Sequence, residues 1–139
     1  MKACQSCLTV CWDFLRRWGP ALVLMLAIFL FSNTPSEEIP NLGGWDRLVK
    51  KGGHMLGYAL LALSLLRGLG RQTGWRSLGL ALLAAALYAA SDELHQSFVP
   101  GRHAAWLDVG IDSLGAAIGL LSARGFAVLR RLIFFGLTD

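Results

Sequence analysis

The stretch SDELHQSFVPGRHAAWLDVGIDSLGAAIG, from Ser91 to Gly119, places charged and amide side chains within and between two apolar segments long enough to cross a bilayer. The polar side chains are Asp92, Glu93, His95, Gln96, Arg102, Asp108 and Asp112. Ionisable groups at membrane depth are costly to hold there and are rare unless they have a function. The stretch therefore predicts two membrane helices that carry a functional polar site.

The composition of the whole chain is that of a membrane protein. Of its 139 residues, 55% are hydrophobic and 16% are charged, whereas soluble domains carry about 25% charged residues. The sequence pI is near 9.3, but the basic residues are scattered at the ends of apolar runs and form no stripe that could track phosphates. We therefore expect a single all-α membrane domain over residues 1–139 and no nucleic-acid partner.

The hydrophobic segments predict an integral membrane bundle of four transmembrane helices. They cover about residues 12–32, 48–67, 76–98 and 104–122. Pro20 would suit the first turn of the first helix. The outer turns of the second helix carry Lys50, Lys51 and His54, so they must be buried against protein or water rather than lipid. The tail, 123–139, is expected to extend the fourth helix or to lie at the membrane interface.

Lysine and arginine are distributed unevenly between the two ends of the predicted helices. One side holds Lys2, Arg16, Arg17, Arg67, Arg71, Arg76, Arg124, Arg130 and Arg131, and the other holds Arg47, Lys50, Lys51 and Arg102. Because basic residues concentrate on the cytoplasmic side of membrane proteins, both termini are predicted to be cytoplasmic. The polar residues would then lie at the extracytoplasmic end of the helices.

Three helical faces are predicted to converge at that outer level. The turn at Pro100-Gly101-Arg102 is short, so the helices on either side should be antiparallel neighbours, with Glu93 opposite Asp108 and Tyr88 opposite Asp112. The faces repeat every three or four residues and consist of Tyr88, Asp92 and Gln96; of Asp108, Asp112, Gly115 and Gly119; and of Lys51, His54 and Tyr58. Gly115 and Gly119 form a G-x-x-x-G pattern that indicates close helix packing.

The residue types at this level suggest roles. Close carboxylates beside a histidine can provide both an acid and a base, so the candidate catalytic residues are His54, Asp92, Glu93 and Asp108. The candidate ligand-binding residues are Lys51, Tyr58, Tyr88, Gln96, Arg102 and Asp112, with Lys51 and Arg102 suited to a phosphate. An alternative stays open, in which Asp92 or Glu93 forms a structural ion pair with Lys51 or Arg102.

Other polar and aromatic residues receive structural interpretations. His95 and His103 are expected at the membrane interface, and the tryptophans Trp45, Trp75 and Trp106 in an aromatic belt. Cys4, Cys7 and Cys11 precede the first helix and are expected as free thiols, with acylation as the alternative. The chain has no compact ligand motif such as H-E-x-x-H, so we expect no metal or other cofactor. The alternative that stays open is a site for Mg²⁺, Mn²⁺ or Zn²⁺, which carboxylates with one histidine would suit.

Several of these pieces together resemble the VanZ-like family of small polytopic bacterial membrane proteins. The pieces are KGGHMLGY (residues 51–58), YAASDELHQ (88–96), VPGR (99–102), Asp108, Asp112, Gly115 and Gly119. The family pattern has an acid where this chain has Lys50 and an amide where it has Asp112. The resemblance implies a role in the cell envelope, in the context of resistance to the glycopeptide teicoplanin.

The residues and the resemblance together predict an outward-facing polar pocket that binds or modifies a lipid or cell-wall-linked headgroup. The expected partners are membrane lipids and a lipid-linked or glycopeptide ligand. Whether the pocket is catalytic stays open, and the oligomeric state is not predicted. The alternative is a non-enzymatic protein that handles lipids or ions, or that serves a structural or assembly role.

Overall fold

The computed structural model describes residues 2–35, 43–70, 73–102 and 104–135 of the chain. Its elements are α1 (Lys2–Ser32), the short 3-10 helix η2 (Gly43–Trp45), α2 (Asp46–Gly68), α3 (Trp75–Gln96) and α4 (Trp106–Phe135). The described ranges contain helices and no strand, so the predicted all-helical class is confirmed. The predicted four segments correspond to the four long helices, although α1 begins ten residues before the predicted start at residue 12.

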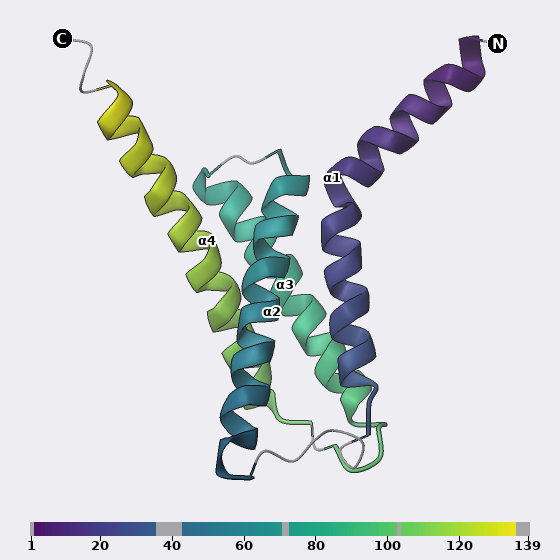
Figure 1. Ribbon diagram of the computed structural model, residues 1–139, viewed down its shortest axis with the longest axis vertical. Coiled ribbons are helices and arrows are strands. Elements are labelled where there is room, and N and C mark those ends of the chain that lie inside the picture. The colour runs from purple at the N-terminus through teal and green to yellow at the C-terminus, as the bar shows by residue number, and fades with distance from the viewer. Residues whose placement is uncertain (1, 36–42, 71–72, 103, 136–139) are drawn as a thin grey trace.

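The four helices stand side by side and alternate in direction (Figure 1). α2 and α3 lie in the middle, between α1 and α4, and the outer parts of α1 and α4 diverge from the bundle at the end that carries both termini. The tail that was expected to extend the fourth helix or to lie at the interface continues α4 without a break to Phe135. We call the opposite end, where α1 ends and α4 begins, the loop end.

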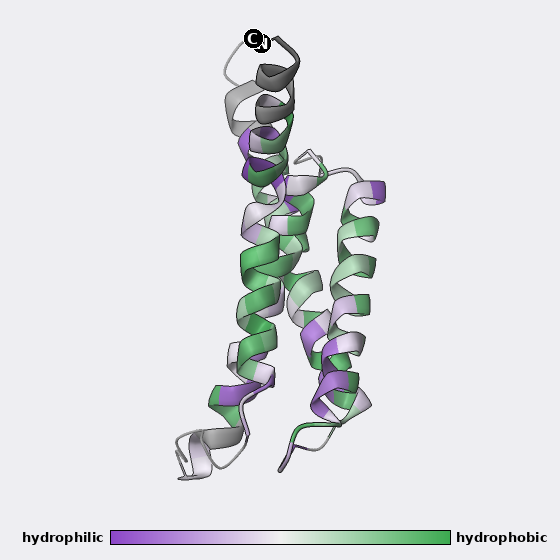
Figure 2. Ribbon diagram, turned by 90° about the vertical axis from the view of Figure 1, so that its right-hand side faces the viewer, coloured by the Kyte–Doolittle hydropathy of each residue, from purple (hydrophilic) through white to green (hydrophobic). Residues whose placement is uncertain are grey.

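Three of the described helices are long and apolar enough to cross a membrane, over Thr9–Ser32, Trp75–Gln96 and Trp106–Arg130. At 1.5 Å per residue, even the 22 residues of α3 exceed the roughly 30 Å of a bilayer core. Figure 2 shows apolar residues along the middle of the bundle and hydrophilic ones toward its ends. Many large apolar side chains of these helices are exposed on the surface, as lipid-facing side chains would be. These are the features of a membrane protein.

Small residues allow the helices to pack closely. One buried cluster joins α2, α3 and α4, and a second joins α1, α2 and α3. The first consists of Ala62, Leu66, Leu78, Ala81, Ala85, Ala116 and Leu120, and the second of Ala21, Ile28, Tyr58, Leu61 and Ala89. Both clusters include residues of α2 and of α3, the two helices that lie between α1 and α4 in Figure 1.

The two glycines of the G-x-x-x-G pattern lie where α4 approaches α2 most closely. A Cβ atom added at Gly115 would lie 2.2 Å from the carbonyl oxygen of Met55, and one at Gly119 would lie 3.0 Å from that of Ala59. A distance below 3.0 Å to backbone is not found in real structures, so α2 and α4 can be this close only with glycine at position 115. The pattern thus serves helix packing within the chain.

Pro20 lies in the interior of α1 and not in the first turn, so the prediction for this residue was wrong. Proline has no N–H, which leaves the carbonyl of the residue four positions earlier, Arg16, without its helical partner. The Arg67 side chain of α2 donates a hydrogen bond of 3.2 Å to this carbonyl oxygen. One turn away, Gly68 packs directly against the ring of Trp18. The interior proline is therefore accommodated by a neighbouring helix.

Arg124, on the part of α4 that extends beyond the bundle, anchors this extension to the start of α3. Its guanidinium lies 4.2 Å from the centre of the Trp75 ring, and it donates a hydrogen bond to the Thr73 carbonyl oxygen. An arginine over an indole is a favourable cation–π contact. Trp75, expected only as part of an aromatic belt, therefore also contacts α4.

Candidate functional site

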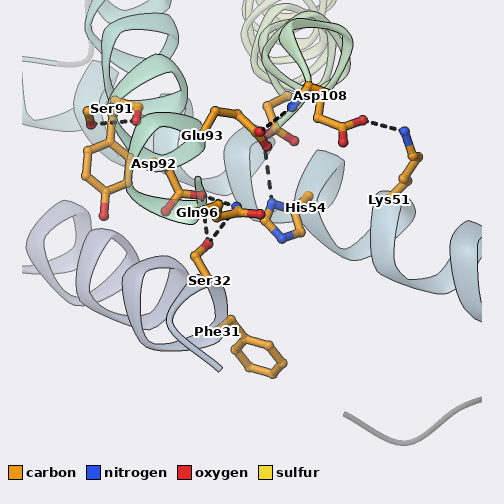
Figure 3. Close-up of polar contacts among 12 residues, drawn as sticks. Phe31, Ser32, Lys51, His54, Ser91, Asp92, Glu93, Gln96 and Asp108 are labelled. Carbon is orange, nitrogen blue, oxygen red and sulfur yellow. Dashed lines mark hydrogen bonds and ion pairs between the residues drawn. The ribbon is translucent and has the colours of Figure 1, made fainter. Parts of the chain in front are cut away.

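The polar side chains singled out from the sequence gather at the loop end (Figure 3). Ser32 comes from the last turn of α1, while Lys51 and His54 come from the first turns of α2. The last turns of α3 and the first turns of α4 contribute the carboxylates. Because the helices alternate in direction, residues near these four helix ends lie at one level. The structure resolves the residues at this level into four groups of contacts.

The first group joins α1 to α3 through a buried carboxylate. Asp92 Oδ2 accepts hydrogen bonds from Ser32 Oγ at 2.7 Å and from Gln96 Nε2 at 3.0 Å. Gln96 Nε2 also donates to Ser32 Oγ at 3.1 Å. All three residues are buried, with 0 to 5% of their surface exposed. The Asp92 side chain is thus part of the helix interface and is held by neutral donors.

The second group is centred on Arg102, which closes the end of α1. Its Nη2 donates to the carbonyl oxygen of Phe31 at 2.9 Å, and both Nε and Nη2 lie 3.3 Å from that of Thr34. Its Nη1 donates to Gln96 Oε1 at 3.3 Å. The last carbonyls of a helix lack partners within the helix, and a cation there also interacts favourably with the helix dipole. Arg102, expected to bind a ligand, has all three nitrogens directed at the chain itself.

The third group consists of two ion pairs between α2 and α4. Lys51 Nζ contacts Asp108 Oδ1, and both side chains are about one-third exposed. One turn deeper, His54 Nδ1 lies 3.7 Å from Asp112 Oδ2. The Asp112 side chain is 2% exposed, whereas that of His54 is 25% exposed. The imidazole therefore lies near a buried carboxylate and is itself partly accessible.

The fourth group holds Glu93 apart from Asp92. Glu93 Oε2 accepts a hydrogen bond of 3.0 Å from the backbone N–H of Ala105, the residue before α4 (Figure 3). Adjacent residues on a helix point about 100° apart, so Asp92 faces α1 while Glu93 faces the start of α4. The sequence left open an ion pair of Asp92 or Glu93 with Lys51 or Arg102. Neither carboxylate forms such a pair in the structure. Lys51 pairs with Asp108 instead.

The two tyrosines differ in how their hydroxyls are satisfied. Tyr88 donates a hydrogen bond of 2.6 Å to the Met25 carbonyl oxygen of α1. Tyr58 is completely buried, and its hydroxyl has no hydrogen-bond partner among the described residues; the same holds for Asp92 Oδ1. The Tyr58 ring lies 6.5 Å from that of His54 and 6.2 Å from that of Tyr88. Buried polar atoms without partners are rare, and each calls for an explanation.

Ser32 is the residue of the site that the sequence reasoning missed. The run Ser32-Asn33-Thr34 reads as the stop of the first helix, yet Ser32 is buried against Asp92. Asn33 likewise contacts α3, with its Oδ1 at 3.2 Å from His95 Nε2. The sequence did contain a signal for this contact. The polar run that ends the first apolar segment lies at the same predicted membrane depth as Asp92 in the third segment.

The remaining expectations concern thiols, histidines and metal ions. His95, expected at the membrane interface, also packs its ring against Phe29 at 4.7 Å. Cys11 is a free, exposed cysteine on α1. The side chains of Cys4 and Cys7 and the whole of His103 lie outside the described residues. Among the residues that are described, no three His, Cys, Asp or Glu side chains group closely enough to hold a metal ion.

Comparison with known proteins identifies the family. The family model VanZ/LLP1 matches residues 17–130, which include all four groups of contacts at the loop end. No curated protein and no solved structure matches the chain. The resemblance noted in the sequence is confirmed. The chain, whose helices include three that are long and apolar enough to span a membrane, belongs to the VanZ/LLP1 family.

Proposed function

We propose that all four helices cross the bacterial inner membrane, with both termini in the cytoplasm and the loop end facing outward. The uneven distribution of lysine and arginine supports this orientation. The least apolar helix, α2, contributes to both buried clusters and so lies within the bundle. Its outer turn, which contains Lys51, pairs with α4. Polar turns of this kind are tolerated at membrane depth when they are buried in protein.

Labelling of single cysteines tests this orientation. In a chain whose native cysteines are replaced by serine, Phe98→Cys and Gly74→Cys place exposed thiols at opposite ends of α3. We expect a membrane-impermeant maleimide to label Phe98→Cys in intact spheroplasts, and to label Gly74→Cys only after the membrane is permeabilised. The reverse pattern would contradict the proposed orientation.

The loop end supports one function best, which is the binding of an envelope lipid or a cell-wall-linked headgroup. The observation that carries this proposal is the partly exposed imidazole of His54, which lies beside the buried Asp112. Beside it, Lys51 is about one-third exposed. An ammonium has three donors, so Lys51 can contact a phosphate oxygen while it still contacts Asp108. The Lys51 ammonium and an N–H of the His54 imidazole suit the phosphate of a headgroup, and the apolar surface around the bundle suits its acyl chains.

Modification of the bound headgroup is the second candidate, and the same histidine favours it. A carboxylate that holds one nitrogen of an imidazole fixes the orientation of the ring, which is how many enzymes position a general base. His54 Nδ1 and Asp112 Oδ2 face each other at 3.7 Å, which is longer than a hydrogen bond, so the two side chains would have to close by a few tenths of an ångström to reach this relation. The link to teicoplanin resistance that the family resemblance implies belongs to this proposal, since binding or altering a cell-wall-linked headgroup changes what a glycopeptide meets at the surface.

The test compares two histidines at the loop end. The full chain and its His54→Gln and His95→Gln variants are placed in vesicles of bacterial envelope lipids. Native mass spectrometry then measures retained lipid and any new product. We expect His54→Gln to retain roughly tenfold less headgroup-bearing lipid. His95→Gln is the control, because this histidine packs on α1 outside the pair with Asp112.

The outcomes separate the candidates. If His54→Gln retains the lipid but forms product about 100-fold more slowly or not at all, the site modifies the headgroup. If no product forms with any variant, the protein binds without chemistry. Unchanged lipid retention and product in His54→Gln would contradict both, and would favour a structural or assembly role. The teicoplanin susceptibility of cells that express the same variants shows whether resistance depends on His54.

A further inference from the structure

A hollow beside Glu93 is separate from the His54–Asp112 pair. It has a volume of about 100 Å³ and is lined by Glu93, Leu94, Ser97, Ala104, Ala105 and Trp106. This is room for roughly three water molecules at about 30 Å³ each, so it suits a small chemical group rather than a whole sugar or nucleotide. It lies where α3 ends and α4 begins.

The one ionisable group in the lining of this hollow is a buried carboxylate without a cation. Glu93 is 6% exposed, and among the described residues the Ala105 N–H is the only donor to Oε2. Its other oxygen accepts no hydrogen bond from a described residue, and no described lysine, arginine or histidine forms an ion pair with it. A buried carboxylate needs more than one neutral donor to offset its lost hydration. The hollow is therefore suited to a cation and unsuited to an anion.

The surroundings add to this preference. Asp92 precedes Glu93 in sequence and carries no cationic partner among the described residues, while Lys51 and Arg102 are engaged by Asp108 and by the end of α1. The hydroxyl of Ser97, also in the lining, donates to the Leu94 carbonyl oxygen. Its donor is thus not available to an anion. In the lining, the Ala105 N–H is the described donor to this carboxylate, and no described cation offsets the negative charge.

One wall of the hollow is an exposed indole. Trp106 is 84% exposed, and an aromatic face attracts ammonium groups through its quadrupole. Leu94 in the lining, and Phe98 and Leu107, which follow the lining residues Ser97 and Trp106 in sequence, are between 63 and 79% exposed. A ligand that combines a cation with hydrocarbon chains would satisfy both features. Amine-bearing phospholipids have this combination.

We propose that the hollow lined by Glu93 and Trp106 binds the ammonium group of an aminophospholipid headgroup. Glu93 contacts the ammonium, and the Trp106 ring covers it from the side. The acyl chains lie along the exposed apolar side chains of α3 and α4. The alternative is that Glu93 only caps the start of α4 through the Ala105 N–H, since a carboxylate near a helix N-terminus is favourable by itself.

Two variants distinguish ligand binding from capping. Glu93→Gln keeps an oxygen that can accept the Ala105 N–H but removes the charge, and Trp106→Leu removes the exposed ring without touching buried residues. Trp45→Leu is the matched control, because Trp45 is also an exposed tryptophan, 71% exposed, in the 3-10 helix before α2. Trp45 does not line the hollow.

The full chain is reconstituted in phosphatidylglycerol vesicles that contain equal traces of phosphatidylethanolamine and its N-acetyl derivative, and native mass spectrometry measures the lipids that stay bound. We expect the wild type and Trp45→Leu to retain the amine form about tenfold over the acetylated form, as befits a charge-assisted contact. Glu93→Gln and Trp106→Leu should lose most of this preference. If ethanolamine added in the water displaces the bound lipid, the ammonium class is supported and a soluble amine is a second source.

Equal retention of the two lipids by the wild type, or an unchanged preference in both Glu93→Gln and Trp106→Leu, would overturn the proposal. The readout is a ratio between two lipids with the same phosphate and acyl chains. A failure of phosphate binding at His54 lowers both lipids together, whereas a failure of amine selection at Glu93 changes their ratio. The two proposals therefore fail in distinguishable ways.

Discussion

Replacing Gly115 by alanine is expected to lower the free energy of unfolding of the bundle by about 3 kcal/mol, the upper end of the usual range for overpacking. The added Cβ would lie 2.2 Å from the Met55 carbonyl oxygen and 2.9 Å from its carbonyl carbon. These are backbone atoms of α2, so no side-chain rotation relieves the clash, and the two helices must separate. Thermal unfolding of the purified protein in detergent measures the effect.

Other glycines of the same helix provide graded controls. Nothing lies within 4 Å of a Cβ at Gly110, so Gly110→Ala should be neutral or should raise stability by up to about 1 kcal/mol through helix propensity. Gly119→Ala should fall between, since its Cβ would lie 3.0 to 3.2 Å from atoms of Ala59. If Gly115→Ala unfolds at the same temperature as Gly110→Ala, the conclusion that α2 and α4 approach closely at Gly115 is wrong.

The sequence predicted the contacts that depend on one helix or on one short turn. The apolar segments predicted the four helices, and the turn around Gly101 predicted that α3 and α4 are antiparallel. The G-x-x-x-G pattern predicted a close approach on the face of α4 that carries Gly115. It did not identify α2 as the partner, because any helix with a suitable surface can pack against a small-residue face.

The contacts that the sequence did not predict depend on residues far apart in the chain. Pro20 looked like a helix start because its missing N–H is harmless there, but Arg67 supplies a donor to the Arg16 carbonyl in the folded bundle. Arg102 looked like a free cation for a ligand, but it lies at the end of α1 and binds the Phe31 carbonyl oxygen. In each case the partner of a polar group comes from another helix, and periodicity within one helix carries no information about it.

The candidate site is likewise a partial match to the prediction. The pattern grouped Tyr88, Asp92 and Gln96 on one face, and the structure directs all three toward α1. That face meets Ser32 rather than the carboxylates of α4. The adjacent acids Asp92 and Glu93, which were grouped together as candidate catalytic residues, lie in separate groups of contacts.

Asp92 is expected to respond very differently to its two simplest replacements. Asp92→Ala removes the acceptor of two buried hydrogen bonds and leaves Ser32 and Gln96 with unsatisfied donors, which should lower the free energy of unfolding by about 3 kcal/mol. Asp92→Asn keeps an oxygen in the place of Oδ2 and removes a charge that no described cation neutralises. Its stability should therefore equal that of the wild type or exceed it by about 1 kcal/mol.

Thermal unfolding of the two variants, with Asp13→Asn on the exposed part of α1 as a control, tests this contrast. If Asp92→Asn is as unstable as Asp92→Ala, the charge itself is structural and must have a cationic partner in the folded protein. If Asp92→Asn is stable, the charge is not there for the fold. At functional sites, the native residue often makes the protein less stable than a simple replacement does.

The lipid assay then decides what the charge of Asp92 does. Oδ1 of Asp92 and the Tyr58 hydroxyl are buried polar atoms without described partners, near His54. If they belong to the site, they act through His54, since neither atom is accessible to a ligand, and a stable Asp92→Asn should retain or convert at least about tenfold less headgroup lipid. Wild-type lipid retention and product in a stable Asp92→Asn would remove Asp92 from the site and leave His54 and Asp112 as its centre. A stable but inactive variant would mean that the chain keeps an unneutralised carboxylate between α1 and α3 because the headgroup, and not the fold, requires it.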